Sequence, residues 1–239
     1  MNSNERILAV IPARGGSKRL HRKNILNLAG KPLIAWTIDA ALKSAFIDKV
    51  VVSSDDTEIL NYSKSYQNLL TIKRPSHLAT DKSSSYEVVM HTIEYMKSMN
   101  EEFELVIMLQ PSSPLRDTSD IDKSILQFQE QKLDGLLGVC ETDHNLMWTN
   151  KLDDNGDMSN FIDKKIINKR SQDLEKFYRL NGAIYLHRIS RLIEEQNFHF
   201  SSNISAFIMP RERSVDIDCK LDLDYANFLI NKFNLNTNS

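Results

Sequence analysis

Cationic side chains gather around a pair of glycines close to the N-terminus. Gly15 and Gly16 lie in a stretch that also holds Arg14, Lys18, Arg19, Arg22 and Lys23. Glycine can adopt positive φ and lets backbone N–H groups approach a ligand closely. Cations and N–H groups arranged in this way suit several negative charges held close together, as in a triphosphate. The alternative is a solvated basic loop that contacts nothing, because runs of charge are usually surface.

An acidic pair near the C-terminus is the second candidate for chemistry. Residues 215–219 alternate apolar and acidic side chains, so a strand here would place Asp216 and Asp218 on one face. Two like charges side by side repel each other unless a cation lies between them. Near a triphosphate such a pair suits Mg²⁺, and Mn²⁺ is expected to substitute for it. The alternative is an exposed strand face without a ligand.

Alternating strands and helices must position these residues. Aliphatic runs predict strands at 7–11, 50–52, 69–72, 105–109, 135–139 and 206–209. Apolar periodicity predicts helices at 33–44, 86–99, 121–131 and 222–233, the last with Ala226, Leu229, Ile230 and Phe233 toward the core. We expect Asp56 or Thr57, the Ser84–Ser85 cluster and Asp120 to cap helices. The pattern indicates an α/β fold whose sheet is mostly parallel and buried on both faces.

One segment interrupts this rhythm. Residues 141–179 contain turn signals, short apolar pieces and mixed charges, and Asp154-Asn155-Gly156 is typical of a hairpin tip. Apolar side chains such as Trp148 and Phe161 need a surface to pack against. We therefore expect one α/β domain made of residues 1–140 and 180–239, with an inserted segment at 141–179.

Composition narrows the classes of function. The 239 residues carry a formal net charge of −2, which argues against a nucleic-acid partner. The sequence has neither an apolar signal region nor an apolar run long enough to span a bilayer, so we expect a cytoplasmic protein without a membrane partner. Cys140 and Cys219 are expected to be free thiols, and no Cys/His cluster has zinc spacing.

Several motifs resemble those of the CMP-sialic acid synthetases, or N-acylneuraminate cytidylyltransferases, a family that includes legionaminic and pseudaminic acid cytidylyltransferases. They are Pro-Ala-Arg-Gly-Gly-Ser-Lys with Lys-Asn (12–24), Leu-Ala-Thr-Asp-Lys-Ser-Ser-Ser (78–85), Gln-Pro-Ser-Ser-Pro-Leu-Arg (110–116), Tyr-Arg-Leu-Asn-Gly-Ala-Ile-Tyr (178–185) and Asp-Ile-Asp (216–218). The chain departs from the family pattern at His21 and Glu175, where proline is expected. It also has Ser171 where the family has the arginine that binds the sugar carboxylate, with Arg170 one residue earlier.

The resemblance implies a three-layer Rossmann-like fold of the nucleotide-diphospho-sugar transferase type. It implies that CTP and a nine-carbon 2-keto sugar acid give a CMP-sugar acid and pyrophosphate. The expected catalytic residues are Arg14, Lys23, Asp216 and Asp218, the two aspartates holding Mg²⁺. The expected nucleotide-binding residues are Arg14, Gly15, Ser17, Lys18, Lys23, Asn24, Arg74, Ser84, Ser85 and Arg116. The expected sugar-acid-binding residues are Gln110, Ser112, Ser113, Arg170, Gln172 and Asn181. The inserted segment is expected to form a homodimer and to lend residues to the partner's site.

Two alternatives stay open at this point. One is a nucleotidyltransferase for another sugar, such as a sugar-1-phosphate, and the other is a nucleotide-binding protein without activity. The presence of both Asp216 and Asp218 argues against the second, because a protein that only binds nucleotide does not need the acidic pair. The motifs do not distinguish sialic, legionaminic and pseudaminic acids, which share the C1 carboxylate and the C2 hydroxyl.

Overall fold

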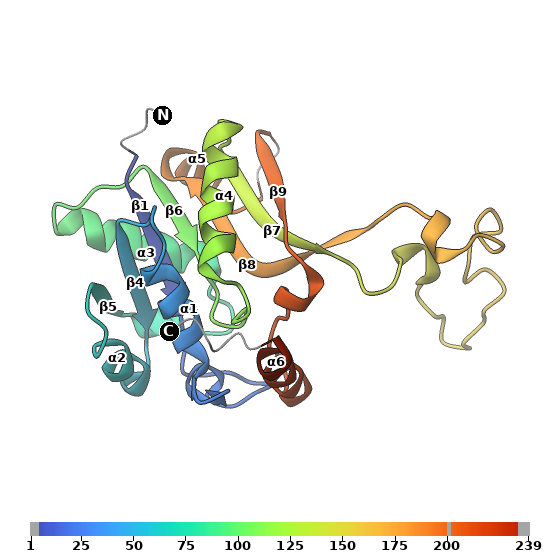
Figure 1. Cartoon of the computed structure of the whole chain (residues 1–239), viewed down its shortest axis with the longest axis horizontal. Helices are drawn as coiled ribbons and strands as arrows, with labels where there is room; N and C mark the ends of the chain where they lie inside the picture. Colours follow the sequence, from blue (N-terminus) through green and yellow to red (C-terminus); the bar gives the residue numbers. More distant parts are fainter. Residues whose placement is uncertain (1–4, 200–201, 234–239) are drawn as a thin grey trace.

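The computed structural model describes residues 5–199 and 202–233. Within them a seven-stranded sheet has the order β5-β4-β1-β6-β8-β7-β9 (Figure 1). Its strands are β1 Ile7–Pro12, β4 Lys49–Ser54, β5 Leu69–Lys73, β6 Leu105–Met108, β7 Gly135–Glu141, β8 Tyr178–Arg188 and β9 Ile204–Ile208. Strand β8 runs antiparallel to β6 and β7, and the other neighbouring strands pair in parallel. The expected α/β fold with a mostly parallel sheet is confirmed.

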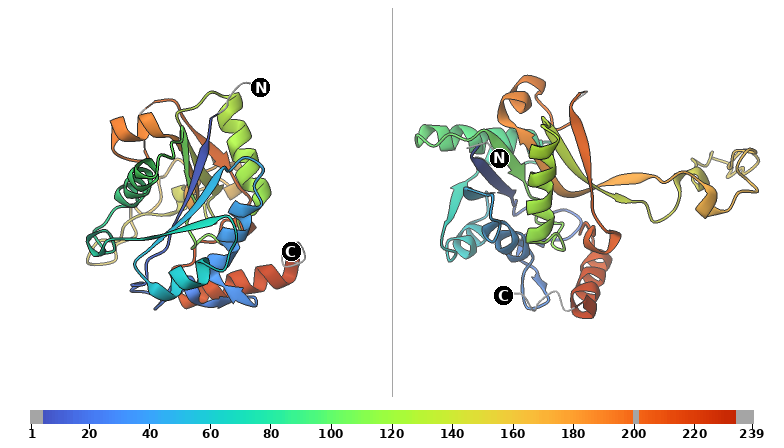
Figure 2. Two further views of the ribbon diagram at one scale, coloured as in Figure 1. Left: turned by 90° about the vertical axis from the view of Figure 1, so that its left-hand side faces the viewer. Right: turned by 45° about the horizontal axis from the view of Figure 1, so that its top comes forward.

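Helices cover both faces of the sheet, which makes three layers (Figures 1 and 2). They are α1 Leu33–Leu42, α2 Thr57–Ser63, α3 Ser85–Ser98, α4 Thr118–Glu130, α5 Ile189–Glu195 and α6 Lys220–Phe233. Alternate residues of β1 face opposite layers: Ile7 and Ile11 pack with α1, α2 and α4, whereas Leu8 and Val10 pack with α3 and α5. The sheet is therefore buried on both faces, as its aliphatic runs predicted. None of the described helices is long and apolar enough to cross a membrane.

Helix caps follow the sequence signals with one correction. The Asp56 carboxylate accepts the N–H groups of Glu58 and Ile59, and Ser84 forms a capping box at the start of α3. Helix α4 begins earlier than expected, because Asp117 rather than Asp120 is its N-cap. Asp120 is the acidic N3 residue of that capping box. The Asp117 carboxylate accepts the Asp120 N–H at 2.8 Å, and the Asp120 carboxylate accepts the Asp117 N–H at 3.2 Å.

The segment that carries the acidic pair is not a strand. Residues 214–218 belong to no helix or strand, and the Ile217 N–H donates to the Ser112 carbonyl at 2.8 Å. Val215 and Ile217 nevertheless pack under α6, which explains the alternation in the sequence. In α6 itself the expected core positions are buried except Phe233, whose side chain is 49% exposed at the helix end.

Residues 142–177 leave the sheet between β7 and β8 and project as a long arm (Figures 1 and 2). The ladder between these strands ends at Glu141 and Tyr178. Within the arm the described backbone forms turns and short 3-10 helices but no strand. The Asp-Asn-Gly turn is present, with Gly156 at φ +69°, yet paired hairpin strands do not flank it.

Candidate active site

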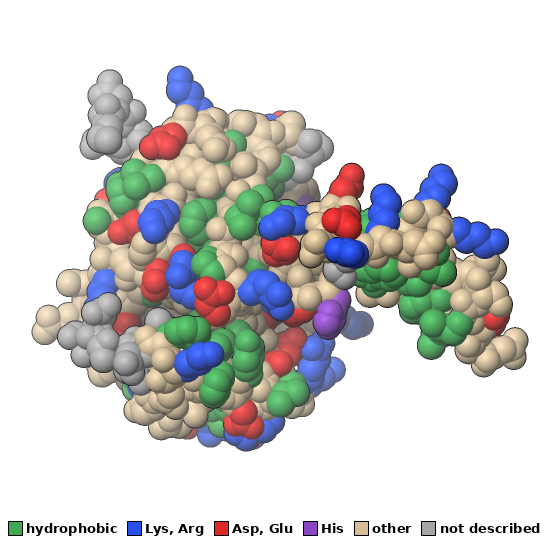
Figure 3. Space-filling model, turned by 45° about the vertical axis from the view of Figure 1, so that its right-hand side comes forward, with side chains coloured by type: hydrophobic (Ala, Val, Ile, Leu, Met, Phe, Trp, Pro, Cys, Tyr) green, Lys and Arg blue, Asp and Glu red, His purple; other side chains and the backbone are tan. Residues whose placement is uncertain are grey.

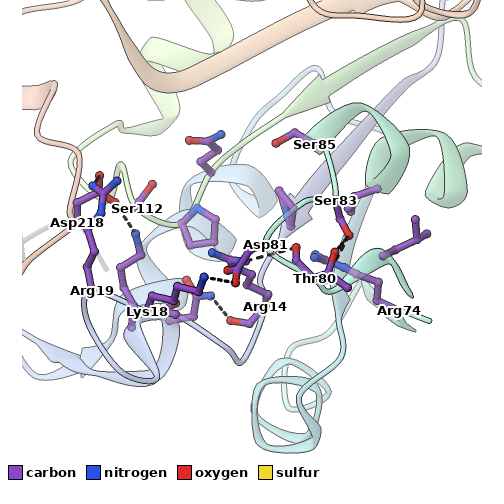
Figure 4. Close-up of a pocket in the computed structure, with 18 of the residues that line it drawn as sticks. Arg14, Lys18, Arg19, Arg74, Thr80, Asp81, Ser83, Ser85, Ser112 and Asp218 are labelled. Carbon is purple, nitrogen blue, oxygen red and sulfur yellow. Dashed lines mark hydrogen bonds and ion pairs between the residues drawn. The ribbon is translucent and has the colours of Figure 1, made fainter. Parts of the chain in front are cut away.

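A pocket of about 510 Å³ lies at the carboxyl ends of β1 and β6, where open α/β sheets bind ligands (Figure 4). Its wall is strongly charged, with five cationic and two acidic side chains. The lining side chains include Arg14, Ser17, Lys18, Arg19, Lys23, Asn24, Arg74, Thr80, Asp81, Ser83, Ser84, Ser85, Gln110, Ser112 and Asp218. The structure thus gathers into one pocket residues from four of the motifs, although Arg14 and Asp218 lie more than two hundred positions apart in the sequence.

The loop after β1 is fastened to the end of β4 through Gly15. The Gly15 N–H donates to the Asp55 carboxylate at 3.0 Å, so this donor is not directed at a phosphate as expected. A Cβ atom at Gly15 would lie 2.6 Å from Oδ2 of Asp56. Neither Gly15 nor Gly16 has positive φ, so the loop does not use the freedom of glycine to adopt it. Glycine at position 15 is required instead by the close approach to Asp56.

Four of the five loop cations line the pocket, and each of the four is paired with a carboxylate of the wall, whereas Arg22 pairs with Glu58 and is not part of the lining. Arg14 and Lys18 contact Asp81 at 2.9 and 2.6 Å. Arg19 and Lys23 contact Asp218 at 2.7 and 3.3 Å. The expected clustering of Arg14, Lys18 and Lys23 with Ser17 is present in the lining.

Sequence reasoning did not single out Arg19 and Asp81. Arg19 was one cation in a charge run, and nothing in that run distinguishes it from its neighbours. Asp81 stands within the 78–85 motif, but its position against the loop is a tertiary contact between residues more than sixty positions apart. The motif was the available signal, although it pointed to the serines that follow Asp81.

A buried arginine lies on the other side of the pocket. Arg74 is 5% exposed and donates to the Ser53 carbonyl oxygen at 2.7 Å and to the Ser53 hydroxyl at 3.3 Å. Burial lowers the pKa of Arg74 to about 10, against the opposing charge of Asp55, so the guanidinium stays cationic at neutral pH. Asn24 is also buried, and its amide donates to the Arg14 carbonyl oxygen at 2.9 Å. Asn24 therefore braces the backbone of the loop.

Ser84 and Ser85 stand at the start of α3 and line the pocket as expected. The Ser84 hydroxyl donates to the Glu87 carboxylate at 2.9 Å and accepts the Glu87 N–H, which commits it to the capping box. Ser85 has no such role in the cap. Of the two hydroxyls, that of Ser85 is the better placed to contact a nucleoside.

The 110–116 turn divides its residues between the pocket and the interior. Gln110 and Ser112 line the pocket, and their contact with a sugar acid stays a prediction. Arg116 is 1% exposed, its Nη1 donates to the Ala183 carbonyl at 3.1 Å, and burial lowers its pKa to about 10. Ser113 is fully buried and donates to the Asn181 carbonyl at 3.1 Å. The structure therefore places Arg116 and Ser113 beneath the pocket, where they brace the turn.

Asn181 is buried as well and does not line the pocket. Its amide nitrogen donates to the Ser214 hydroxyl at 3.0 Å, and its oxygen accepts the Ala183 N–H at 3.1 Å. The next residue, Gly182, has φ +72°, and a Cβ there would lie 2.9 Å from Oε1 of Gln110. Asn181 thus joins β8 to the segment before Asp216, and in this arrangement its role is to hold the wall.

The acidic pair is asymmetric. Asp216 is largely buried, and its Oδ1 has no hydrogen-bond partner among the residues that the structure describes. Burial raises the pKa of Asp216, a hydrogen bond from Ser112 lowers it, and the charge of Asp218 raises it further. Asp218 is half exposed and pairs with Arg19 and Lys23, two cations that lie far from it in the sequence.

The acidic pair can supply part of a cation site. The described residues contain no group of three or more His, Cys, Asp or Glu side chains that could enclose a metal by themselves. An orphaned Asp216 oxygen next to the Asp218 carboxylate nevertheless suits a hard cation that takes its remaining ligands from phosphate and water. The donor set present fits Mg²⁺ on that condition.

The two candidate residues of the arm do not reach this pocket. Arg170 and Gln172 are exposed, and neither lines the pocket of its own chain. The arm that carries them points away from the sheet (Figure 1). Their expected contact with the sugar acid stays a prediction, and it requires a second copy of the chain.

The family model described as "Cytidylyltransferase" matches residues 8–226. A pseudaminic acid cytidylyltransferase from Campylobacter jejuni is 36% identical over 222 residues, covering 93% of this chain and 95% of the relative. A CMP-N,N'-diacetyllegionaminic acid synthase from Legionella pneumophila is 35% identical over 225 residues, covering 91% and 93%. An N-acylneuraminate cytidylyltransferase from Escherichia coli is 36% identical over 223 residues, covering 92% of this chain and 51% of the relative.

Solved structures share the fold at lower identity. A CMP-2-keto-3-deoxy-manno-octonic acid synthetase in complex with CTP superposes with a TM-score of 0.69 at 19% identity, covering 95% of this chain and 99% of the other. A 4-diphosphocytidyl-2C-methyl-D-erythritol synthase from Anaerococcus prevotii gives a TM-score of 0.65 at 14% identity, covering 96% and 100%. At these identities the likeness supports the three-layer fold alone.

Proposed function

The chain belongs to the cytidylyltransferase family, and on that basis we propose that it activates a nine-carbon 2-keto sugar acid with CTP. The products are the CMP-sugar acid and pyrophosphate. The relatives described above agree on this reaction type and differ in the sugar acid they are named for. The observation that carries the proposal is the pocket in which Arg14, Lys18, Arg19 and Lys23 converge beside Asp218, the exposed member of the acidic pair.

Charge and position make the loop the binding site for the triphosphate. Guanidinium and ammonium groups bind phosphate oxygens through charge-assisted hydrogen bonds, and Arg14 and Lys23 are held by their neighbours in the pocket wall. In the reaction the C2 hydroxyl oxygen of the sugar acid attacks the α-phosphorus, and pyrophosphate leaves. Arg14 and Lys23 would stabilise the charge that accumulates on the leaving group.

The nucleoside and the sugar acid would occupy opposite sides of the triphosphate. Ser85 and Arg74 line one side and present a hydroxyl and a buried cation, which suit the polar edges of a base and a ribose. Gln110 and Ser112 line the other side, next to Asp218. Holding both substrates in this pocket orients the C2 hydroxyl toward the α-phosphorus, which is a large part of the catalysis expected of such a site.

Asp216 and Asp218 would hold the Mg²⁺ ion. When bound there, the ion would supply Lewis acidity and neutralise part of the phosphate charge. The Asp218 carboxylate is shared with Arg19 and Lys23, so these cations must turn to the phosphates when a metal takes their place. The buried Asp216 carboxylate has fixed surroundings and needs no comparable rearrangement.

We also propose that the protein is a homodimer in which each arm completes the partner's pocket. The arm exposes a hydrophobic patch (Figure 3), and Leu146, Leu152, Met158 and Ile167 are 48%, 60%, 57% and 57% exposed. A patch of this kind favours burial against another chain. Arg170 lies on the same arm and would meet the sugar carboxylate of the other subunit.

Subunit mixing tests this arrangement. Arg170→Ala removes the arm side chain that would bind the sugar carboxylate, and Lys23→Ala removes a pocket side chain that would bind the triphosphate. Each variant by itself should therefore be inactive. Random mixing yields heterodimers with one intact composite site, and activity should return to about a quarter of the wild-type value. No recovery in mixtures that sedimentation shows to be heterodimeric, or a fully active monomer, would contradict the proposal.

Variants of the loop test the function itself. Arg14→Ala and Lys23→Ala should each lower the rate of pyrophosphate release about 100-fold or more, because each removes a group that stabilises transition-state charge. Circular dichroism and gel filtration should be unchanged, since both side chains lie in the pocket wall rather than in the core. Wild-type rates with wild-type CTP affinity in either variant would refute the assignment.

A further inference from the structure

Two segments of the pocket wall are joined by a single carboxylate. Asp81 extends from the 78–85 segment to the loop after β1, and Figure 4 shows it between Arg14 and Lys18. Its Oδ1 accepts from Nη1 of Arg14 at 2.9 Å, and its Oδ2 lies 2.6 Å from Nζ of Lys18. Arg14 also donates to the Thr80 carbonyl oxygen at 3.4 Å. Asp81 thus uses one oxygen for each cation.

Folding gains little from this contact. The side chains of Arg14, Lys18 and Asp81 are 36%, 76% and 44% exposed, and ion pairs this open to water contribute weakly to stability. The 78–85 segment does not depend on it either. Ser83 donates to the His77 carbonyl oxygen at 2.9 Å and shares a hydrogen bond with the Thr80 hydroxyl at 2.8 Å. The turn therefore keeps its own hydrogen bonds when Asp81 moves.

The arrangement matches that of a phosphate group between an arginine and a lysine. Both cations prefer an oxyanion with separate oxygens for each donor, and Asp81 offers this with one negative charge. We propose that Asp81 is an internal anion that occupies the phosphate position of Arg14 and Lys18 in the nucleotide-free protein. The triphosphate of CTP displaces it on binding, and it returns as pyrophosphate leaves.

This role has two consequences, and both rest on the proposed function. Asp81 weakens the binding of every polyphosphate at the loop, so it favours release of the pyrophosphate product. Its displacement also loosens the segment that carries Ser84 and Ser85 from the loop, because Asp81 makes both ion pairs between Arg14 or Lys18 and that segment. Arrival of the phosphates is thereby coupled to the part of the wall that faces the nucleoside.

The test compares three ligands in titration calorimetry at one fixed ionic strength: CTP, inorganic pyrophosphate and cytidine. Asp81→Asn keeps the shape of the side chain and removes its charge. Binding of CTP and of pyrophosphate should tighten about three- to tenfold, as expected from losing two exposed competing pairs. Binding of cytidine, which lacks phosphate, should not change.

A matched control distinguishes the loss of the Asp81 ion pairs from a general change in the electrostatic potential of the pocket. Glu87→Gln removes one charge from the start of α3, and glutamine can keep the capping box with Ser84. Glu87 contacts none of the loop cations, so this variant should bind CTP and pyrophosphate as the wild type does. Equal tightening in both variants would overturn the proposal, as would unchanged or weaker pyrophosphate binding in Asp81→Asn. A wild-type protein that binds pyrophosphate but not CTP would overturn the proposed function instead.

Discussion

Adding one methyl group at either of two adjacent glycines should have different effects on this protein. In Gly15→Ala the new Cβ would lie 2.6 Å from Oδ2 and 2.8 Å from Cβ of Asp56, whereas in Gly16→Ala it would meet nothing within 4 Å. Ordinary contact begins near 3.4 Å, so the loop or Asp56 must move by about 0.8 Å. Neither glycine has positive φ, so the backbone itself accepts alanine at both positions.

Both ways of relieving the overlap carry a cost. If Asp56 turns away, α2 loses the cap on the N–H groups of Glu58 and Ile59, worth about 1 kcal/mol. If the loop moves, the hydrogen bond from the Gly15 N–H to Asp55 lengthens and Arg14 is displaced with it. Overpacking of this kind typically costs about 1–3 kcal/mol. A loss of 1.4 kcal/mol carried entirely by the loop would raise the KM for CTP about tenfold.

Urea unfolding and pyrophosphate-release kinetics measure the two effects. Gly15→Ala should lose about 1–3 kcal/mol of unfolding free energy and show a raised KM for CTP. The unfolding free energy of Gly16→Ala should stay within about 0.5 kcal/mol of the wild type. Equal stabilities of the two variants, or a larger loss in Gly16→Ala, would show that the close approach of Gly15 to Asp56 does not hold the loop.

Two further predictions concern the acidic pair and pH. Asp218→Asn should raise the Mg²⁺ concentration needed for activity, whereas Asp222→Asn should not. Asp222 accepts the N–H groups of Asp218 and Cys219, and asparagine can do the same. The reverse result in a Mg²⁺ titration would show that the metal is assigned to the wrong carboxylate. Burial lowers the pKa of His187 to about 3, so below about pH 6.5 only the unfolded chain gains this proton and stability falls by up to about 1.4 kcal/mol per pH unit. His187→Gln should reduce the pH dependence of the unfolding free energy, measured by urea unfolding between about pH 7 and 5. An unchanged pH dependence would show that His187 is not the group responsible.

Local signals predicted most of the fold. Aliphatic runs marked the strands because both faces of the sheet are covered, and Asp56 and Ser84 cap helices as their residue types indicate. The cap of α4 was misplaced because Asp117 and Asp120 are both acidic, and a capping box uses both. The alternation around Asp216 predicts a strand that the structure does not contain, because burial of every second residue under α6 leaves the same pattern as a sheet ladder.

The pocket was predictable in composition more than in detail. Arg14, Lys23 and Gln110 meet there because the carboxyl ends of neighbouring parallel strands share one edge of the sheet. Whether a side chain lines the pocket or is buried beneath it was not predictable. An arginine in a turn with two prolines can face the pocket or the interior, and Arg116 faces the interior. Pairings between distant segments, such as Arg19 with Asp218, depend on tertiary structure that residue types do not encode.

One end-point assay tests the proposed reaction most directly. The wild-type protein is incubated with CTP, Mg²⁺ and, in separate reactions, sialic, legionaminic or pseudaminic acid, and both pyrophosphate and the nucleotide product are quantified. We predict that at least one acid yields CMP-sugar acid and pyrophosphate in equal amounts, and that Lys23→Ala yields neither above background. No CMP-sugar acid from any of the three acids, with a folded protein that binds CTP, would contradict the assignment of a nine-carbon sugar acid as substrate.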